Sequence, residues 1–250
     1  MAGHSHASNV KHRKNANDSK RSASFTKLLR GVYVAAKAGM PDIDANPMLR
    51  SATYLARKGG VPNDRILAAI KKASGSNSSD ETYEYVQYEG YANGGVAVII
   101  NALTDNRTRT ASDLRHTFSK NGGNLGESGN VSYLFEHNGV IIYNKKSLGN
   151  SIEKFMESAI EHDIIDIINN DEDSDSDILI YTTIPNFNNV KESLYKEFGE
   201  SDRAELRFIP QMKTEISSTE AFEKFIKLIE IIENNDDVQS VDHNAEYTGE

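Results

Sequence analysis

The sequence predicts an α+β protein of several domains: a basic three-helix domain at the N-terminus, then two ferredoxin-like α/β domains, one inserted in the other. Its 250 residues exceed the roughly 100–200 of one ordinary domain. Apolar residues recur at the three- and four-residue spacing of helices before residue 75, and at the spacing typical of strands after residue 82. Charge divides at the same place: residues 1–76 hold 14 Lys and Arg against 4 Asp and Glu (+10), and the remainder holds 14 against 33 (−19).

The helical domain, residues 1–76, is expected to begin with an arm over residues 1–16, which contain no acid and no apolar period. Apolar residues then recur three and four positions apart up to Gly39, as on one face of a helix. Asn46 as N-cap and Pro47 at the first helical position start a second helix. The predicted helices are 18–38, 46–58 and 62–74.

The first α/β domain combines residues 77–136 with 209–250. Its predicted strands are 83–88, 96–103, 131–135, 212–216 and 238–246, and its helices are 105–120 and 219–233. A glycine-rich loop, 121–129, follows the first helix and is expected to be an ordinary turn. Phe222, Phe225 and Ile229 recur at helical spacing, which predicts a buried face on the second helix.

The inserted domain, residues 137–208, is predicted from a β-α-β-β-α-β order, which is typical of a ferredoxin-like fold. The elements are strand 140–143, helix 151–162, strands 164–168 and 178–184, helix 190–198 and strand 204–209.

Several functional classes are disfavoured by composition. The chain has no cysteine, so it has no thiol chemistry or Cys-ligated metal, and a reducing cytoplasm fits best. Apolar runs such as 95–100 are far shorter than the roughly 20 residues of a membrane helix. Carboxylates and histidines are scattered, and no nucleophile motif occurs. We therefore expect no enzyme, cofactor, metal site, small-molecule substrate or membrane partner.

Positive charge in the N-terminal segment points to nucleic acid as the partner, DNA or ribosomal RNA. Phosphates complement clustered cations, and their neutralisation releases counterions. The alternatives are an arm lying on the acidic remainder of the same chain, or a solvated face. The candidate residues are Lys11, His12, Arg13, Lys14, Lys20, Arg21, Lys27 and Arg30.

A second candidate phosphate site lies where helix 105–120 begins. Arg107 and Arg109 could clamp a phosphate beside the unpaired N–H groups of the first turn, with Arg115 further along. The alternative is plain capping by Asp105 or Asn106 with solvated arginines.

Acidic residues surround the end of helix 219–233 and follow it. Glu230, Glu233, Asp236 and Asp237 could bind a ribosomal or other basic protein, which would make the α/β domains a protein-contact surface. Their solubilising effect explains them as well, and a solvated role is preferred.

Short segments in order along the chain carry a resemblance to a known family. They are Ala2-Gly-His-Ser5, Asn9-Val-Lys-His-Arg-Lys14, Phe25-Thr-Lys-Leu28, Asn46-Pro47, Tyr88-Glu-Gly-Tyr91, Gly94-Gly-Val-Ala97, Thr104-Asp-Asn-Arg107, Phe118-Ser-Lys120, Gly122-Gly-Asn-Leu-Gly126 and His243-Asn-Ala245. Together they resemble the YebC/PmpR family. Two segments depart from it: His6-Ala7 stands where the family usually has Lys-Trp, and Ala92-Asn93 where it has Gly-Pro.

The resemblance implies a helical N-terminal domain, two α/β domains and control of gene expression through nucleic acid. The family is known for transcriptional regulators, and members have also been assigned to translation, as a mitochondrial activator and as ribosome-associated factors. It therefore leaves DNA and ribosomal RNA open as targets. Because the aromatic residue of the arm is missing here, its contribution to base stacking, about 1–3 kcal/mol per base, is lost.

Overall fold

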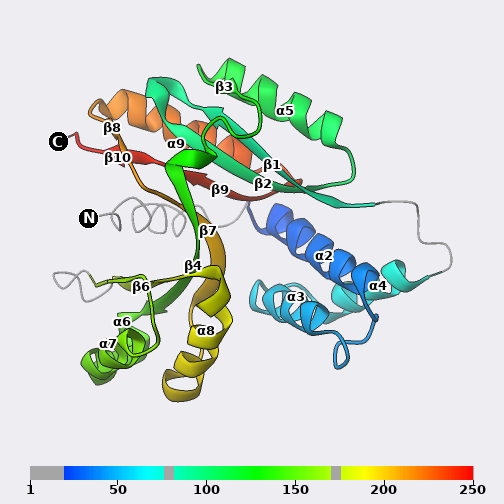
Figure 1. The fold of residues 1–250 in the computed structure, drawn as a ribbon. Helices are drawn as coiled ribbons and strands as arrows, with labels where there is room; N and C mark the ends of the chain where they lie inside the picture. Colours follow the sequence, from blue (N-terminus) through cyan, green and yellow to red (C-terminus); the bar gives the residue numbers. More distant parts are fainter. Residues whose placement is uncertain (1–19, 76–81, 170–175, 250) are drawn as a thin grey trace.

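The computed structural model describes residues 20–75, 82–169 and 176–249 (Figure 1). Three helices form the N-terminal part: α2 (Lys20–Ala38), α3 (Pro47–Lys58) and α4 (Asn63–Ser74). Asn46 caps α3 by accepting a hydrogen bond from the backbone N–H of Leu49 at 3.1 Å, and Pro47 occupies the first turn. The helices enclose a small apolar core of their own, which includes Val32, Ala36, Leu49, Ala56 and Ile66.

The first sheet draws strands from both ends of the α/β region, in the order β3-β1-β2-β9. These strands are β1 (Glu84–Tyr91), β2 (Ala97–Thr104), β3 (Asn124–Leu125) and β9 (Val238–His243). Helices α5 (Arg107–Lys120) and α9 (Thr219–Glu233) pack against it through Leu114, Phe118, Phe225, Leu228 and Ile232. Strands β8 (Thr214–Ile216) and β10 (Ala245–Tyr247) form a separate two-stranded parallel sheet, and β10 follows β9 directly in the chain.

The second sheet is formed by residues 135–210 alone, in the order β5-β6-β4-β7 with antiparallel neighbours. Its strands are β4 (Phe135–Asn144), β5 (Asp166–Ile168), β6 (Asp177–Thr182) and β7 (Arg203–Pro210). The helices that follow β4 and β6 are α6 (Lys145–Leu148), α7 (Ile152–Ile160) and α8 (Ile184–Phe198), with η3 (Gly149–Ser151) between the first two. This order is that of a ferredoxin-like fold. The predicted α+β fold class is confirmed, whereas the exact domain boundaries stay a prediction.

A buried ion pair joins the two sheets. Arg207 of β7 donates through Nε to Asp242 of β9 at 2.5 Å, and through Nη2 to the carbonyl of Val241 at 3.0 Å. Burial opposes the charge of the guanidinium, but Asp242 and Glu205 outweigh it and raise the pKa of Arg207. Burial raises the pKa of the Asp242 carboxyl, although the charge of Arg207 and its hydrogen bond oppose this rise. The bonds from Arg207 to Asp242 and Val241 fix one sheet against the other.

Several predicted elements differ from the structure. The single strand expected over 238–246 is two strands, β9 and β10, which belong to different sheets, and the residues of the strand expected over 140–143 lie in β4, which begins already at Phe135. The strand expected over 131–135 is a short 3-10 helix, η2 (Ser132–Leu134), and the strand begins at Phe135. The glycine-rich loop contains β3, a two-residue strand on β1, where only a turn was expected. Helix α8 starts at Ile184, six residues earlier than expected. Thr183 caps it by accepting from the backbone N–H of Asn186, and three Asn residues interrupt the apolar pattern of its first turns.

Neither a membrane-crossing helix nor a metal-binding cluster is found in the part of the chain that the structure describes. No helix there is long and apolar enough to cross a bilayer. Within the same residues, no group of three or more His, Asp and Glu side chains could hold a metal ion.

Candidate nucleic-acid interface

The arm residues Lys11, His12, Arg13 and Lys14 lie outside the described residues. The other seven candidate cations lie on two helices. Lys20 and Arg21 belong to the first turn of α2, with Lys27 and Arg30 further along it. Arg107, Arg109 and Arg115 lie on α5. The two predicted phosphate sites therefore reside on helices from different parts of the chain.

Lys27 and Arg30 are turned toward the acidic part of the same chain. The Lys27 ammonium donates to the backbone carbonyl of Glu233 at the end of α9. Arg30 donates through Nη1 to the carbonyls of Leu103 and Asp236, at 2.8 and 2.9 Å, and to Asp237 Oδ1 at 2.8 Å. In this conformation both cations of α2 therefore join the helical domain to the first sheet, whereas the intramolecular alternative weighed for the arm concerns residues outside those that the structure describes.

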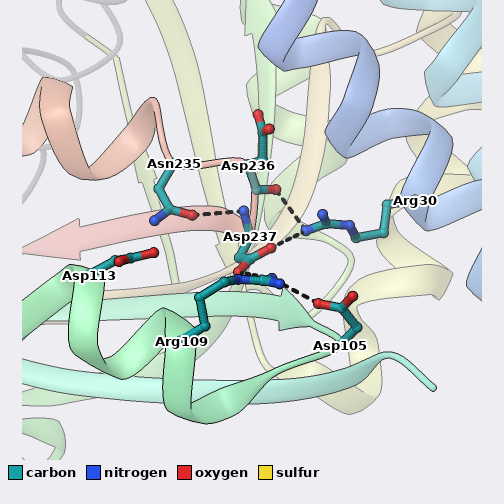
Figure 2. A pocket seen from close by; sticks show the side chains of 7 residues that line it. All are labelled: Arg30, Asp105, Arg109, Asp113, Asn235, Asp236 and Asp237. Carbon is teal, nitrogen blue, oxygen red and sulfur yellow. Dashed lines mark hydrogen bonds and ion pairs between the residues drawn. The ribbon is translucent and has the colours of Figure 1, made fainter. Parts of the chain in front are cut away.

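Asp237 is the centre of this joint, and Figure 2 shows Arg30 and Arg109 approaching it. Its Oδ2 accepts from Arg109 at 2.8 Å and from the hydroxyls of Thr110 and Thr104 at 2.6 and 3.2 Å. The two guanidinium groups therefore bind opposite oxygens of one carboxylate. A polar cavity of about 430 Å³ opens beside it, lined by Arg30, Asp105, Arg109, Asp113, Asn235, Asp236 and Asp237.

The network keeps Asp237 ionised. Burial alone would raise the pKa of this carboxyl, but hydrogen bonds from Arg109, Thr110 and Arg30 together outweigh burial and lower it. In return, hydrogen bonds to Asp237 and Asp105 raise the pKa of Arg109. The preferred sequence interpretation of Asp237 as a solvated acid is wrong, because only 4% of the residue is exposed.

The start of α5 has the features of a capped helix. The Asn106 side chain accepts from the backbone N–H of Arg109 at 3.0 Å, and Arg109 also binds Asp105 at 2.8 Å. Arg107 lies 3.6 Å from Glu84, and its carbonyl accepts from the Tyr88 hydroxyl. Capping, the alternative weighed for this position, thus accounts for Asn106 and Arg109, while Arg115 is exposed on the outer side of the helix.

A second joint, which the sequence pattern does not reveal, lies at the end of α3. Lys58 donates to the carbonyl of Ser201 at 2.9 Å and lies 3.7 Å from Glu200, both in the loop before β7. The helical domain therefore contacts the first sheet region and also the loop that precedes β7 of the second sheet. Within the described part of the chain, Arg65 and Lys71 on the exposed side of α4 form no ion pair.

The glycine-rich loop is organised by Glu89 of β1. This buried carboxylate accepts backbone N–H groups from Gly129, Val131 and Ser132 at 2.9, 2.7 and 2.9 Å. Burial favours the neutral acid, but the three backbone donors outweigh burial and lower the pKa of Glu89. These three loop amides are therefore saturated from within the protein.

Fold and site together define a class of protein in which a small cationic helical module is fastened to an acidic α/β body. Family models identify the chain within this class. The model described as "TACO1/YebC second and third domain" matches residues 83–245, and the "TACO1/YebC protein N-terminal domain" matches 5–76. The chain belongs to the TACO1/YebC family, as its resemblance indicated.

Similar proteins cover the chain from end to end. A "Probable transcriptional regulatory protein" of Wolbachia pipientis wMel is 47% identical over 99% of this chain and 98% of its own length. A protein of the same name from Rickettsia bellii is 44% identical over 100% of this chain and 96% of its own. The crystal structure of a conserved hypothetical protein from Aquifex aeolicus matches with a TM-score of 0.80 and 42% identity, over 93% of each chain.

Proposed function

We propose that this protein is a cytoplasmic, non-enzymatic regulator of gene expression that binds DNA through its basic N-terminal domain. The observation that carries the proposal is the division of charge, +10 over residues 1–76 and −19 over the remainder. A basic module attached to an acidic one is attracted to polyanions locally, although the whole chain carries a net charge of −9. The names of the curated relatives support a role in regulation.

The contact surface consists of the arm cations Lys11, Arg13 and Lys14 together with the basic start of α2. Phosphate contacts from such residues set affinity and register but carry no base information. The acidic α/β domains are left for protein partners. Ribosomal RNA is the alternative target, with a role in translation, since it presents the same phosphates.

Salt-dependent binding by the full chain tests this proposal. Fluorescence anisotropy with duplex DNA and with ribosomal RNA fragments, across a salt titration, gives the slope of log affinity against log salt. The triple variant Arg13→Ala, Lys14→Ala, Arg21→Ala is expected to lower the slope on duplex DNA by nearly one unit for each phosphate that it no longer neutralises. The control variant carries Lys196→Ala, Lys224→Ala and Lys227→Ala, which remove the same charge from the acidic part.

The target is decided by which nucleic acid binds. Sequence-selective binding to DNA, with no co-sedimentation with ribosomes on a sucrose gradient, supports the transcriptional role. Co-sedimentation with ribosomes, without sequence-selective binding to DNA, would replace the transcriptional role by a role in translation. An equal slope for the two triple variants would contradict the assignment to the arm.

A further inference from the structure

One helix of the acidic α/β region exposes a stripe of hydroxyl groups and positive charge. Its residues are Thr108, Ser112, Arg115, His116, Ser119 and Lys120 of α5, all of them exposed. We propose that this face is a second phosphodiester-binding surface, separate from the arm and the start of α2. The inference rests on the proposed function and adds a contact surface in the α/β region.

Helical geometry places these side chains together. Thr108, Ser112, Arg115 and Ser119 follow one another at spacings of four and three, so they form one stripe, with His116 and Lys120 beside it. The opposite side of α5 is anchored, because Thr110, Leu114 and Phe118 are buried. Packing of that side fixes the direction in which the stripe faces.

The cations of this stripe are available, unlike the two arginines at the start of the helix. Arg109 is held by Asp237 and Asp105, and Arg107 lies beside Glu84. Among the residues that the structure describes, no ion pair or side-chain hydrogen bond holds Arg115, His116 or Lys120. The phosphate site expected at the helix start is therefore better located on its outer, C-terminal half.

The one acid of α5 does not belong to the stripe. Asp113 lines the cavity beside Arg109 and Asp237, as Figure 2 shows. The row formed by Thr108, Ser112, Arg115 and Ser119 therefore holds no carboxylate of its own helix, while the exposed Asp113 lies one turn before His116, on the side of the cavity.

The chemistry of the stripe fits a nucleic-acid backbone. Serine and threonine hydroxyls donate to phosphate oxygens alongside Arg and Lys in protein–DNA complexes. From residue 108 to 120 the helix rises about 18 Å at 1.5 Å per residue, which corresponds to about five base-pair steps of 3.4 Å. An acidic protein surface would need the cations but not the row of hydroxyls, so the composition favours phosphodiesters.

Position also connects this surface with the helical domain. Arg30 of α2 and Arg109 of α5 bind the same carboxylate, so the first turn of α5 lies close to α2. One polyanion could then contact both surfaces, and each additional phosphate would add to the salt dependence of binding.

The test uses full-length protein, duplex DNA and a ribosomal RNA hairpin, with the double variant Arg115→Ala, Lys120→Ala. We expect the salt slope on duplex DNA to fall by about 1.8 units and the affinity at 0.1 M salt to fall about 10- to 60-fold. On single-stranded RNA segments the slope is expected to fall by about 1.4 units. Lys224→Ala with Lys227→Ala is the charge-matched control, and Arg115→Lys should retain wild-type binding, which separates the effect of charge from that of misfolding.

Failure of the inference and failure of the proposed function give different results. If the arm variant weakens binding but the double variant of α5 binds like its control, the surface on α5 does not bind nucleic acid. That result overturns this inference and leaves the proposed function standing. If the wild-type protein binds neither DNA nor RNA, both are overturned. Competition by poly-glutamate as strong per charge as that by DNA would identify a general acidic-protein site and overturn the phosphodiester assignment.

Discussion

Replacing Asp237 by Asn removes the charge on which the joint between the helical domain and the first sheet is built. The carboxylate accepts four hydrogen bonds, from Arg30, Arg109, Thr110 and Thr104. The amide of Asn presents one oxygen and one NH2 group, so the NH2 group must face a donor. The substitution therefore weakens the bonds on one side of the residue and leaves Arg30 dependent on two backbone carbonyls.

The expected loss follows from the exposure of each partner. Arg109 is about half exposed, so its pair contributes at most about 0.5 kcal/mol. The Arg30 side chain is 12% exposed, and a hydrogen bond to a charged partner contributes about 1.5–3 kcal/mol. Because the Asn oxygen can still accept from the hydroxyl of Thr110, the free energy of unfolding should fall by about 2–3.5 kcal/mol at neutral pH.

Urea denaturation followed by circular dichroism measures this change. The matched control is Asp236→Asn, which makes the same chemical change at the neighbouring, exposed position and should cost less than about 0.5 kcal/mol. Because the pKa of Asp237 is lowered in the folded protein, its contribution is complete above the usual Asp pKa of 3.8. It is lost as pH falls through the lower folded-state value.

Two outcomes would refute this reasoning. One is an equal loss of stability in the Asp236 and Asp237 variants at pH 7. The other is a difference between wild type and Asp237→Asn that stays constant as pH falls well below 3.8.

Three further predictions concern buried groups. Glu89→Gln should lower the free energy of unfolding by about 2 kcal/mol, because the backbone N–H groups of the glycine-rich loop lose the carboxylate that accepts them. Amide hydrogen exchange should become faster, most of all at Gly129. Unchanged exchange at Gly129 would contradict this role of Glu89. Arg207→Ala should lower the free energy of unfolding by about 3–5 kcal/mol, because it leaves Asp242 buried without its partner. The double variant Arg207→Met, Asp242→Leu should lower it much less, since it removes both charges. Equal losses in urea denaturation would argue against a buried ion pair. Gly139→Ala should lower the free energy of unfolding by about 1–3 kcal/mol, since a Cβ at this position would clash with the Phe187 ring and the Thr182 hydroxyl. A melting temperature equal to that of the wild type would show that α8, which carries Phe187, shifts to make room for the Cβ.

Local signals made much of the fold predictable. The N-cap at Asn46 with Pro47, and the apolar period of helix 219–233, depend on residues a few positions apart, and both appear as expected. The β-α-β-β-α-β order predicted the ferredoxin-like sheet for the same reason, since each element carries its own pattern. What failed lay where local pattern is weak: the start of α8 and the short η2 helix.

The joint at Asp237 could not be predicted from local pattern. Its two arginine partners are 207 and 128 residues away in the chain. In the sequence, an aspartate that follows a polar helix end looks like a solvent-exposed, solubilising charge. Only its burial, which the sequence does not show, distinguishes such a charge from an aspartate that holds two elements together. The same reason hides the hydrogen bond between Lys58 and Ser201, which are 143 residues apart.

The position of β9 in the first sheet sets an order for folding during synthesis. Strand β2 pairs with β9, with Val98 opposite His243, so this sheet is incomplete until almost the whole chain has left the ribosome. The second sheet is contained in residues 135–210 and can close as soon as they emerge, because domains generally fold as units during synthesis. A chain interrupted before residue 238 would thus carry a finished ferredoxin-like unit beside an open β2 edge, an exposed strand of the kind that promotes aggregation.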